Sequence, residues 1–226
     1  MRHHLAPSLA FACTLAFAGQ ACADDVTFTG FAHGSQTVNF SLFLPNTVAS
    51  GAVNAGGFAT ILDGSPSFVS YCVDLYQHIT FGTLYPEYTA PGTSHVFSNT
   101  ARAYGDLGRL YSVAGTVDNS VEEAAFQIAA WEIAYETQDG AYGLGDGTAR
   151  FSGGTAASSG ALMLASTWLT GLGAGTDVGI NVIESRDHQD VIFAPVPEPS
   201  TVALMLGGLA ATAGFARRGR PDKKRQ

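Results

Sequence analysis

Alternating apolar and polar positions dominate the first third of the chain and predict β-strands. The pattern runs from residue 26 to about residue 88, and residues 37–44 form a β-rich run within it. Residues 57–62 and 67–74 have the same character and are separated by the turn-forming sequence Asp63-Gly64-Ser65-Pro66. We therefore expect these two segments to pair as a hairpin.

The middle of the chain changes to the helical period of apolar positions. Residues 99–111 and 157–172 are predicted to be helices on this spacing. Another helix is expected to begin at Ser120, where Ser120 and Glu123 have the spacing of a capping box. The face of this helix opposite its apolar stripe carries three acidic residues, Glu122, Glu132 and Glu136.

Strand patterns return near the end of the chain, at residues 178–183 and 190–194. Strands, then helices, then strands again predict an α+β fold. We expect a mainly antiparallel β-sandwich or barrel with a helical insert at about residues 98–172. Residues 24–195 are numerous enough to form one extracytoplasmic domain with its own hydrophobic core.

The start of the chain has the layout of a signal peptide. A positively charged beginning is followed by an apolar stretch at residues 5–18 and by Ala21-Cys22-Ala23, a small-residue cleavage sequence. Residues 1–23 are therefore expected to be removed on export. Lipidation of Cys22 is the alternative, although Gly19 stands where a lipobox has an aliphatic residue.

The end of the chain has three parts. The sequence Val196-Pro197-Glu198-Pro199 leads into an uncharged apolar run at residues 201–216, which six Arg and Lys residues follow. The run is shorter than the roughly 20 residues of a typical transmembrane helix, so we expect a weak membrane anchor. The basic end favours the cytoplasmic side, which leaves residues 24–195 outside the membrane. An ordinary C-terminal anchor would have the same topology.

This tail resembles the sorting tail of PEP-CTERM proteins of Gram-negative bacteria, a tail also named after the C-terminal domain of ice-binding proteins. The resemblance implies that the protein is first anchored in the inner membrane and that an exosortase-like enzyme processes it near Val196-Pro197-Glu198-Pro199. The protein would then be at the cell surface or in the medium. It also implies an association with exopolysaccharide and biofilm. The regular threonine ladders of an ice-binding face are not visible in the sequence.

Charge narrows the set of possible partners. Residues 24–195 contain 17 acidic side chains and four arginines, a net charge of minus 13, and no lysine. Such a domain repels phosphate backbones, so nucleic acid is excluded as a partner. Because lysine is absent there, an internal isopeptide crosslink to asparagine is excluded as well.

Patterns for metal or cofactor chemistry are weak. The acidic loop that contains Asp139 and Asp146 lacks the spacing of a calcium hand, and the glycines at 171–175 follow a predicted helix, the wrong context for a dinucleotide site. No metal or cofactor is therefore predicted. The histidines of the domain lack the spacing of a helix-borne metal pair: His33, His78, His95 and His188.

Cys72 is the one cysteine left in the domain, and its simplest role is that of a small buried hydrophobe. Three motifs give it a second interpretation, because they resemble the signatures of bacterial surface thioester domains. They are Tyr71-Cys72-Val73, the helical sequence from Gln127 to Trp131, and His188-Gln189-Asp190. The resemblance implies that Cys72 supplies the sulfur and Gln189 the acyl group, with Gln127 and Trp131 as the supporting helix.

Three functions follow from these patterns. The first is a non-enzymatic, exported surface or matrix protein. The second is a covalent adhesin with an internal thioester, which an amine-bearing surface would open. The third is an exported hydrolase, which would show paired acids or a Ser-His pair in a cleft.

Overall fold

The computed structural model describes residues 23–44, 47–90 and 97–195. The predicted signal peptide, the sequence 196–199 and the apolar run at 201–216 lie outside these residues. Within the described parts of the chain, no helix is long and apolar enough to cross a membrane.

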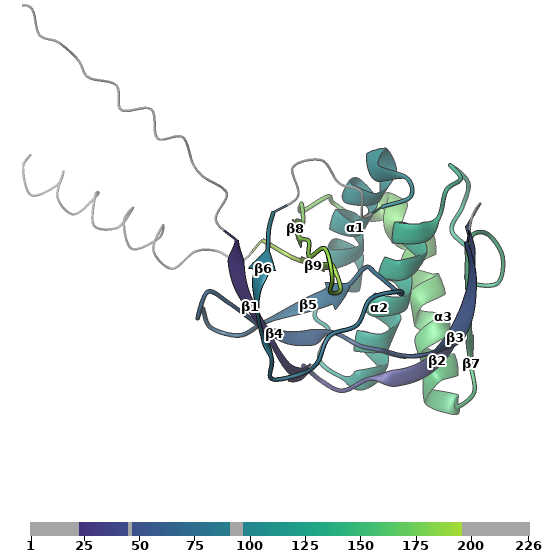
Figure 1. Ribbon diagram of the computed structural model, residues 1–226. Helices are drawn as coiled ribbons and strands as arrows, with labels where there is room; N and C mark the ends of the chain where they lie inside the picture. Colours follow the sequence, from purple (N-terminus) through teal and green to yellow (C-terminus); the bar gives the residue numbers. More distant parts are fainter. Residues whose placement is uncertain (1–22, 45–46, 91–96, 196–226) are drawn as a thin grey trace, which may run out of the picture.

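A six-stranded antiparallel sheet forms one side of the domain (Figure 1). Its strand order is β6-β1-β4-β5-β9-β8. The sheet curls so far that a bridge between Thr89 and Glu184 joins the ends of β6 and β8, and a half-barrel results. Its strands are β1 (Asp24–Phe31), β4 (Phe58–Leu62), β5 (Phe68–Cys72), β6 (Leu84–Tyr88), β8 (Asn181–Ile183) and β9 (Val191–Phe193).

The predicted hairpin is confirmed, since β4 pairs with β5 through the partners Phe58 and Ser70. Its turn contains Asp63 and Gly64, with φ angles of 49° and 69°. Asp and Gly are the residues that accept this left-handed conformation at least cost. The Asp63 side chain also accepts a hydrogen bond from the backbone N–H of Asp25 at 2.9 Å, which ties the turn to β1.

A second antiparallel sheet has the order β3-β2-β7, with β2 at Gln36–Leu44, β3 at Thr47–Ala55 and β7 at Ala149–Gly153. Strand β7 falls inside the segment that was predicted to be helical. Its alternation of buried and exposed residues covers only five positions, too few to stand out between two helices.

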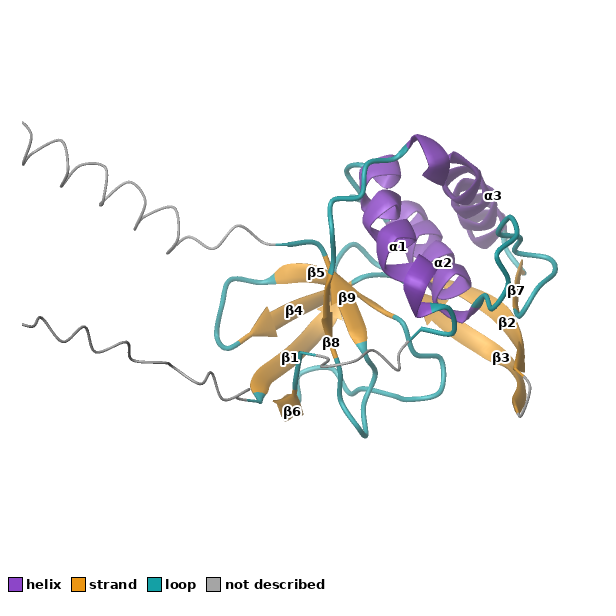
Figure 2. Cartoon of the chain, turned by 90° about the horizontal axis from the view of Figure 1, so that it is seen from above, coloured by secondary structure: helices purple, strands orange, loops and turns teal. Residues whose placement is uncertain are grey.

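Three helices pack together beside the two sheets, and α2 lies between the sheets (Figure 2). They are α1 (Thr100–Ala114), α2 (Ser120–Tyr135) and α3 (Ala156–Gly171), and a 3-10 turn, η1 (Leu172–Ala174), follows α3. Helix α2 contacts β5 of the large sheet and all three strands of the small one. The antiparallel α+β prediction is therefore confirmed, but the sandwich is not, because the sheets pack on the helices and not on each other.

The surroundings of α2 differ from the sequence prediction. Asn119, not Ser120, is the N-cap, and its side chain accepts from the N–H groups of Val121 and Glu122 at 3.1 Å each. Glu123 is turned inward and fully buried, so the predicted capping box is wrong.

The predicted solvent face of α2 is wrong in part as well, because Glu132 and Glu136 are buried. A loop after the helix covers them: the backbone N–H of Gly143 donates to Glu132, and that of Thr148 donates to Glu136. Burial raises the pKa of Glu132 to about 8, so this side chain is mostly uncharged at neutral pH.

Candidate functional site

Cys72 is the last residue of β5 and lies where this strand meets helix α2. On one side it pairs with Val191 of β9. On the other side the Gln127 carboxamide replaces a neighbouring strand: the Cys72 N–H donates to Gln127 Oε1 at 3.1 Å, and Gln127 Nε2 donates to the Cys72 carbonyl at 2.6 Å. Both groups are buried, so these two bonds fix the backbone of Cys72 against the helix.

The Cys72 thiol is directed at the backbone of Asp74. Its Sγ donates to the Asp74 carbonyl oxygen at 2.7 Å and lies 3.2 Å from the Asp74 N–H, which donates to it. Burial raises the pKa of the thiol, and the charges of Asp74 and Asp190 raise it further. A free Cys72 is therefore a protonated thiol at neutral pH.

Trp131 closes the inner side of the site. Its ring is buried and stacks on Phe151 with the centroids 6.0 Å apart. The indole N–H lies near enough to the Cys72 sulfur to favour its ionised form, although it makes no hydrogen bond to any atom of the described residues. Gln127 and Trp131 thus both reach Cys72 from α2, as the sequence motifs predict.

Gln189 meets Cys72 at a single atom, the carbonyl oxygen of Asp74. Gln189 Nε2 donates to this oxygen at 3.4 Å, and Cys72 Sγ donates to it at 2.7 Å. The sulfur and the amide nitrogen are consequently no more than about 6 Å apart. The fold therefore brings together the four residues that the sequence singled out, from three distant parts of the chain.

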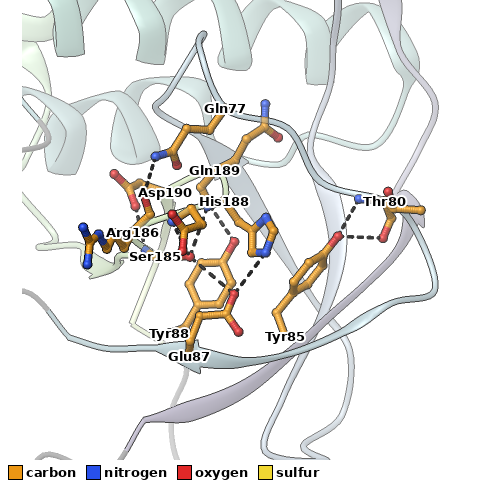
Figure 3. A network of polar contacts seen from close by, with 11 residues as sticks. Gln77, Thr80, Tyr85, Glu87, Tyr88, Ser185, Arg186, His188, Gln189 and Asp190 are labelled. Carbon is orange, nitrogen blue, oxygen red and sulfur yellow. Dashed lines mark hydrogen bonds and ion pairs between the residues drawn. The ribbon is translucent and has the colours of Figure 1, made fainter.

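The turn between β8 and β9 positions Gln189 through bonds of its own (Figure 3). Ser185 Oγ accepts from the N–H groups of Asp187 and His188 at 3.3 and 3.1 Å. The Ser185 N–H in turn donates to Asp190 Oδ1 at 2.8 Å. The turn is thus tied at both ends around Gln189.

Two side chains from the first half of the chain hold the same turn from outside. Tyr88 OH donates to the backbone carbonyl of Gln189 at 2.7 Å, and Gln77 Nε2 donates to that of Arg186 at 3.0 Å (Figure 3). The sequence analysis assigned no role to Asp74, Tyr88 or Asp190. The position of Asp190 directly after Gln189 was the one feature of the sequence that could have indicated its place in the site.

An open hollow of about 260 Å³ lies at this end of β5. Asp74 and Asp190 both line it, and its exposed rim includes Tyr76 and Ser98. Burial raises the pKa of Asp190 to about 7, against the opposing effect of its hydrogen bond from Ser185. Near neutral pH, Asp190 can therefore both accept and release a proton.

A serine and a histidine also occur in this turn, but they do not form a hydrolytic pair. Ser185 Oγ and His188 Nε2 each contact Glu87 Oε1, at 3.4 and 3.3 Å, and the His188 ring packs on Tyr85 with the centroids 4.4 Å apart. The serine oxygen is occupied by backbone N–H groups of its own turn. In the described ranges, no three His, Cys, Asp or Glu side chains are gathered to hold a metal ion.

The end of the chain matches a known protein motif. Residues 195–220 match the PEP-CTERM protein-sorting motif. The motif indicates an exported surface protein whose tail is anchored in the membrane and processed by an exosortase, in agreement with the sequence analysis. It gives no support to the ice-binding name. No curated protein and no solved structure matches the chain, so the thioester interpretation of the domain rests on its own residues.

Proposed function

We propose that the domain is a covalent adhesin, sorted by way of its PEP-CTERM tail, whose reactive group is a thioester between Cys72 Sγ and the side-chain carbonyl carbon of Gln189. The observation that carries the proposal is the position of both side chains on the Asp74 carbonyl oxygen. The shared oxygen keeps the sulfur and the carboxamide nitrogen that would leave within about 6 Å of each other.

The bond forms by exchange of nitrogen for sulfur. The Cys72 sulfur attacks the carboxamide carbon of Gln189, the C–N bond breaks, and the NH₂ group leaves with the thiol proton as ammonia. Asp190 is the group that we assign to carry this proton, because its charge acts on Cys72 and its own pKa is about 7. The Trp131 N–H, which has no other described partner, is available to the carbonyl oxygen.

A primary amine of the target surface then opens the bond. The amine nitrogen attacks the same carbon of Gln189, the C–S bond breaks, and an amide joins the target to Gln189 while Cys72 regains a thiol. The hollow lined by Asp74 and Asp190 is the solvent side from which we propose that the amine approaches. Each molecule reacts once, which makes the protein a crosslinking surface component and not an enzyme.

Two properties of the domain protect such a bond before it meets a target. Cys72 and Trp131 are 1% exposed, which keeps water from the inner side of the bond. Residues 24–195 contain no lysine, so the domain has no ε-amine of its own to consume the thioester. Amine-bearing matrix polymers, including the exopolysaccharide that the PEP-CTERM tail suggests, are the targets that we propose.

Intact-mass measurement of the exported chain tests the proposal. The expected mass is short by one ammonia, and incubation with methylamine should add one methylamine to the chain, at Gln189. The Cys72→Ser variant should have the full mass and no adduct. A wild-type mass equal to that of the plain sequence, with a thiol titratable after unfolding, would exclude the thioester.

A further inference from the structure

The two sheets have four edge strands, and three of them are protected against pairing with another chain. Strands β6 and β8 of the large sheet meet each other at the Thr89–Glu184 bridge. In addition, β6 contains Pro86 and Glu87, and β8 has only three residues. Proline, charge and shortness are the usual devices by which proteins blunt the edges of their sheets.

The small sheet has one protected edge and one unprotected edge. Strand β7 is five residues long, carries Arg150 and packs against α3. Strand β3 has nine residues in unbroken register with β2, and it contains no charge, no proline and no bulge. In the parts of the chain that the structure describes, no hydrogen bond joins its outer edge to another segment.

The side chains of β3 are also unusually accessible. Val48 is 74% exposed, and Ser50, Gly51, Ala52 and Asn54 are exposed as well. A long, flat and uncharged edge of this kind is a template for strand addition. Its N–H and C=O groups are the recognition elements, because it offers no charged side chain to a partner.

We propose that β3 is a docking edge for β3 of a second copy of this chain, in an antiparallel pair with its two-fold axis at Gly51. This register places Ser50 of one copy opposite Ala52 of the other, and Val48 opposite Asn54. All pairs across the junction are small or uncharged. The two three-stranded sheets then form one continuous sheet of twice the width.

A second copy fits this edge better than a charged partner for two reasons. A two-fold interface uses the same patch on both molecules, and the sequence of β3 is compatible with itself in that register. The domain carries a net charge of minus 13, yet none of that charge lies on β3. Like charges elsewhere oppose association at long range, so added salt should strengthen the pairing.

The proposal is independent of the thioester and is tested by disulfide trapping of the full-length chain in membranes. A Cβ added at Gly51 would lie 3.4 Å from the Phe40 ring, an ordinary contact, so Gly51→Cys should fold. Directly opposed residues of antiparallel strands lie about 4.5–5.5 Å apart between Cα atoms, within the range of a disulfide. We therefore expect Gly51→Cys to give dimers under mild oxidation.

Val48→Cys is the matched control, since Val48 is an exposed residue of the same strand but would lie about 20 Å from its counterpart in the proposed register. The expected result is a covalent dimer for Gly51→Cys, more of it at higher salt, and monomer for Val48→Cys and the wild type. Equal crosslinking of the two variants, or none in either, would overturn the proposal.

Charge reversal gives a second test that does not depend on a new cysteine. In the proposed register, Ser50→Lys with Ala52→Lys sets like charges directly opposite each other, as does the corresponding Glu pair. Each double variant alone should sediment as a monomer in mild detergent, whereas an equal mixture of the two should dimerise. A Met163→Lys, Val178→Lys variant, changed at exposed sites away from β3, should behave as the wild type. Failure of the mixture to pair would contradict the register.

Discussion

Two glutamines reach Cys72 from different parts of the fold, and they are held in opposite ways. Gln127 on α2 is buried and uses both ends of its carboxamide on the Cys72 backbone. Among the described residues, the Gln189 carboxamide makes one long contact, 3.4 Å from Nε2 to the Asp74 oxygen, while the backbone carbonyl of Gln189 accepts a hydrogen bond from Tyr88. A glutamine whose carboxamide is hydrogen-bonded at both ends stabilises the fold. A glutamine whose backbone is fixed while its carboxamide is weakly held can react.

The largest expected effect is the loss of chemistry on Gln189→Ala. Without the carboxamide there is no acyl group for Cys72, so neither ammonia loss nor a methylamine adduct should appear in the intact mass of the exported chain. The midpoint of denaturant unfolding should fall no further than in Cys72→Ser, which cannot form the bond either. If Gln189→Ala still gave a mass short by one ammonia, another glutamine, Gln127 first, would have to be the acyl donor.

Among the variants that lack the thioester, Gln127→Leu should lower the free energy of unfolding most. The substitution leaves the buried N–H and C=O of Cys72 without partners, which costs about 2–4 kcal/mol of unfolding free energy. Denaturant unfolding in the Cys72→Ser background measures this cost without a contribution from the thioester. Gln77→Leu removes one exposed hydrogen bond and should cost less than about 1 kcal/mol. Equal costs for the two variants would mean that Gln127 is not the structural glutamine.

The pH dependence of bond opening should follow Asp190. Only its ionised form can take a proton from the attacking amine, and burial raises its pKa to about 7. The rate constant for bond opening, calculated for the unprotonated form of methylamine, should therefore rise up to tenfold per pH unit below pH 7 and level off above pH 7. A tenfold rise corresponds to a decrease of about 1.4 kcal/mol in the activation free energy. Asp190→Asn keeps an oxygen for the Ser185 N–H and should give a slow, flat profile. A wild-type profile without a bend near pH 7 would remove Asp190 from this role.

Tyr88→Phe should have the smallest effect on the thioester chemistry. It removes one hydrogen bond, to the Gln189 carbonyl, and keeps the buried ring, so the unfolding free energy should fall by about 1 kcal/mol. Ammonia loss should still go to completion, more slowly, as followed by mass during refolding. Complete absence of the bond in this variant would show that the turn, and not the carboxamide tip, determines reactivity.

Local signals in the sequence predicted much of the secondary structure. The turn residues Asp63 and Gly64 indicated the hairpin, and the apolar period indicated α1 and α3 to within a few residues. Burial of Glu132 and Glu136 could not be predicted, because it depends on the backbone of a loop that folds back over α2. Local patterns also could not predict that α2 contacts strands of both sheets, because those contacts join residues far apart in the chain.

At the site, short motifs predicted which residues gather, but not how they are held. The resemblance of the motifs around Cys72, Gln127 and Trp131 to thioester domains implied that one face of α2 lies against the end of a strand. The Asp74 carbonyl that links Cys72 to Gln189 is a backbone atom, and no residue type identifies it. The hydrogen bond from Tyr88 to the Gln189 carbonyl likewise depends on the curl of the sheet, which brings β6 close to the turn before β9.

The position of Gln189 in the chain determines how the domain would carry a mechanical load. After the proposed reaction, the target is attached to the Gln189 side chain, and only the short segment from Asp190 to Pro195 separates this residue from the sorting tail. Tension between target and cell therefore passes through β9 and a few flanking residues, while the other strands and all three helices carry none of it. The load-bearing part is one short covalent path, and the domain could unfold around it without releasing its target.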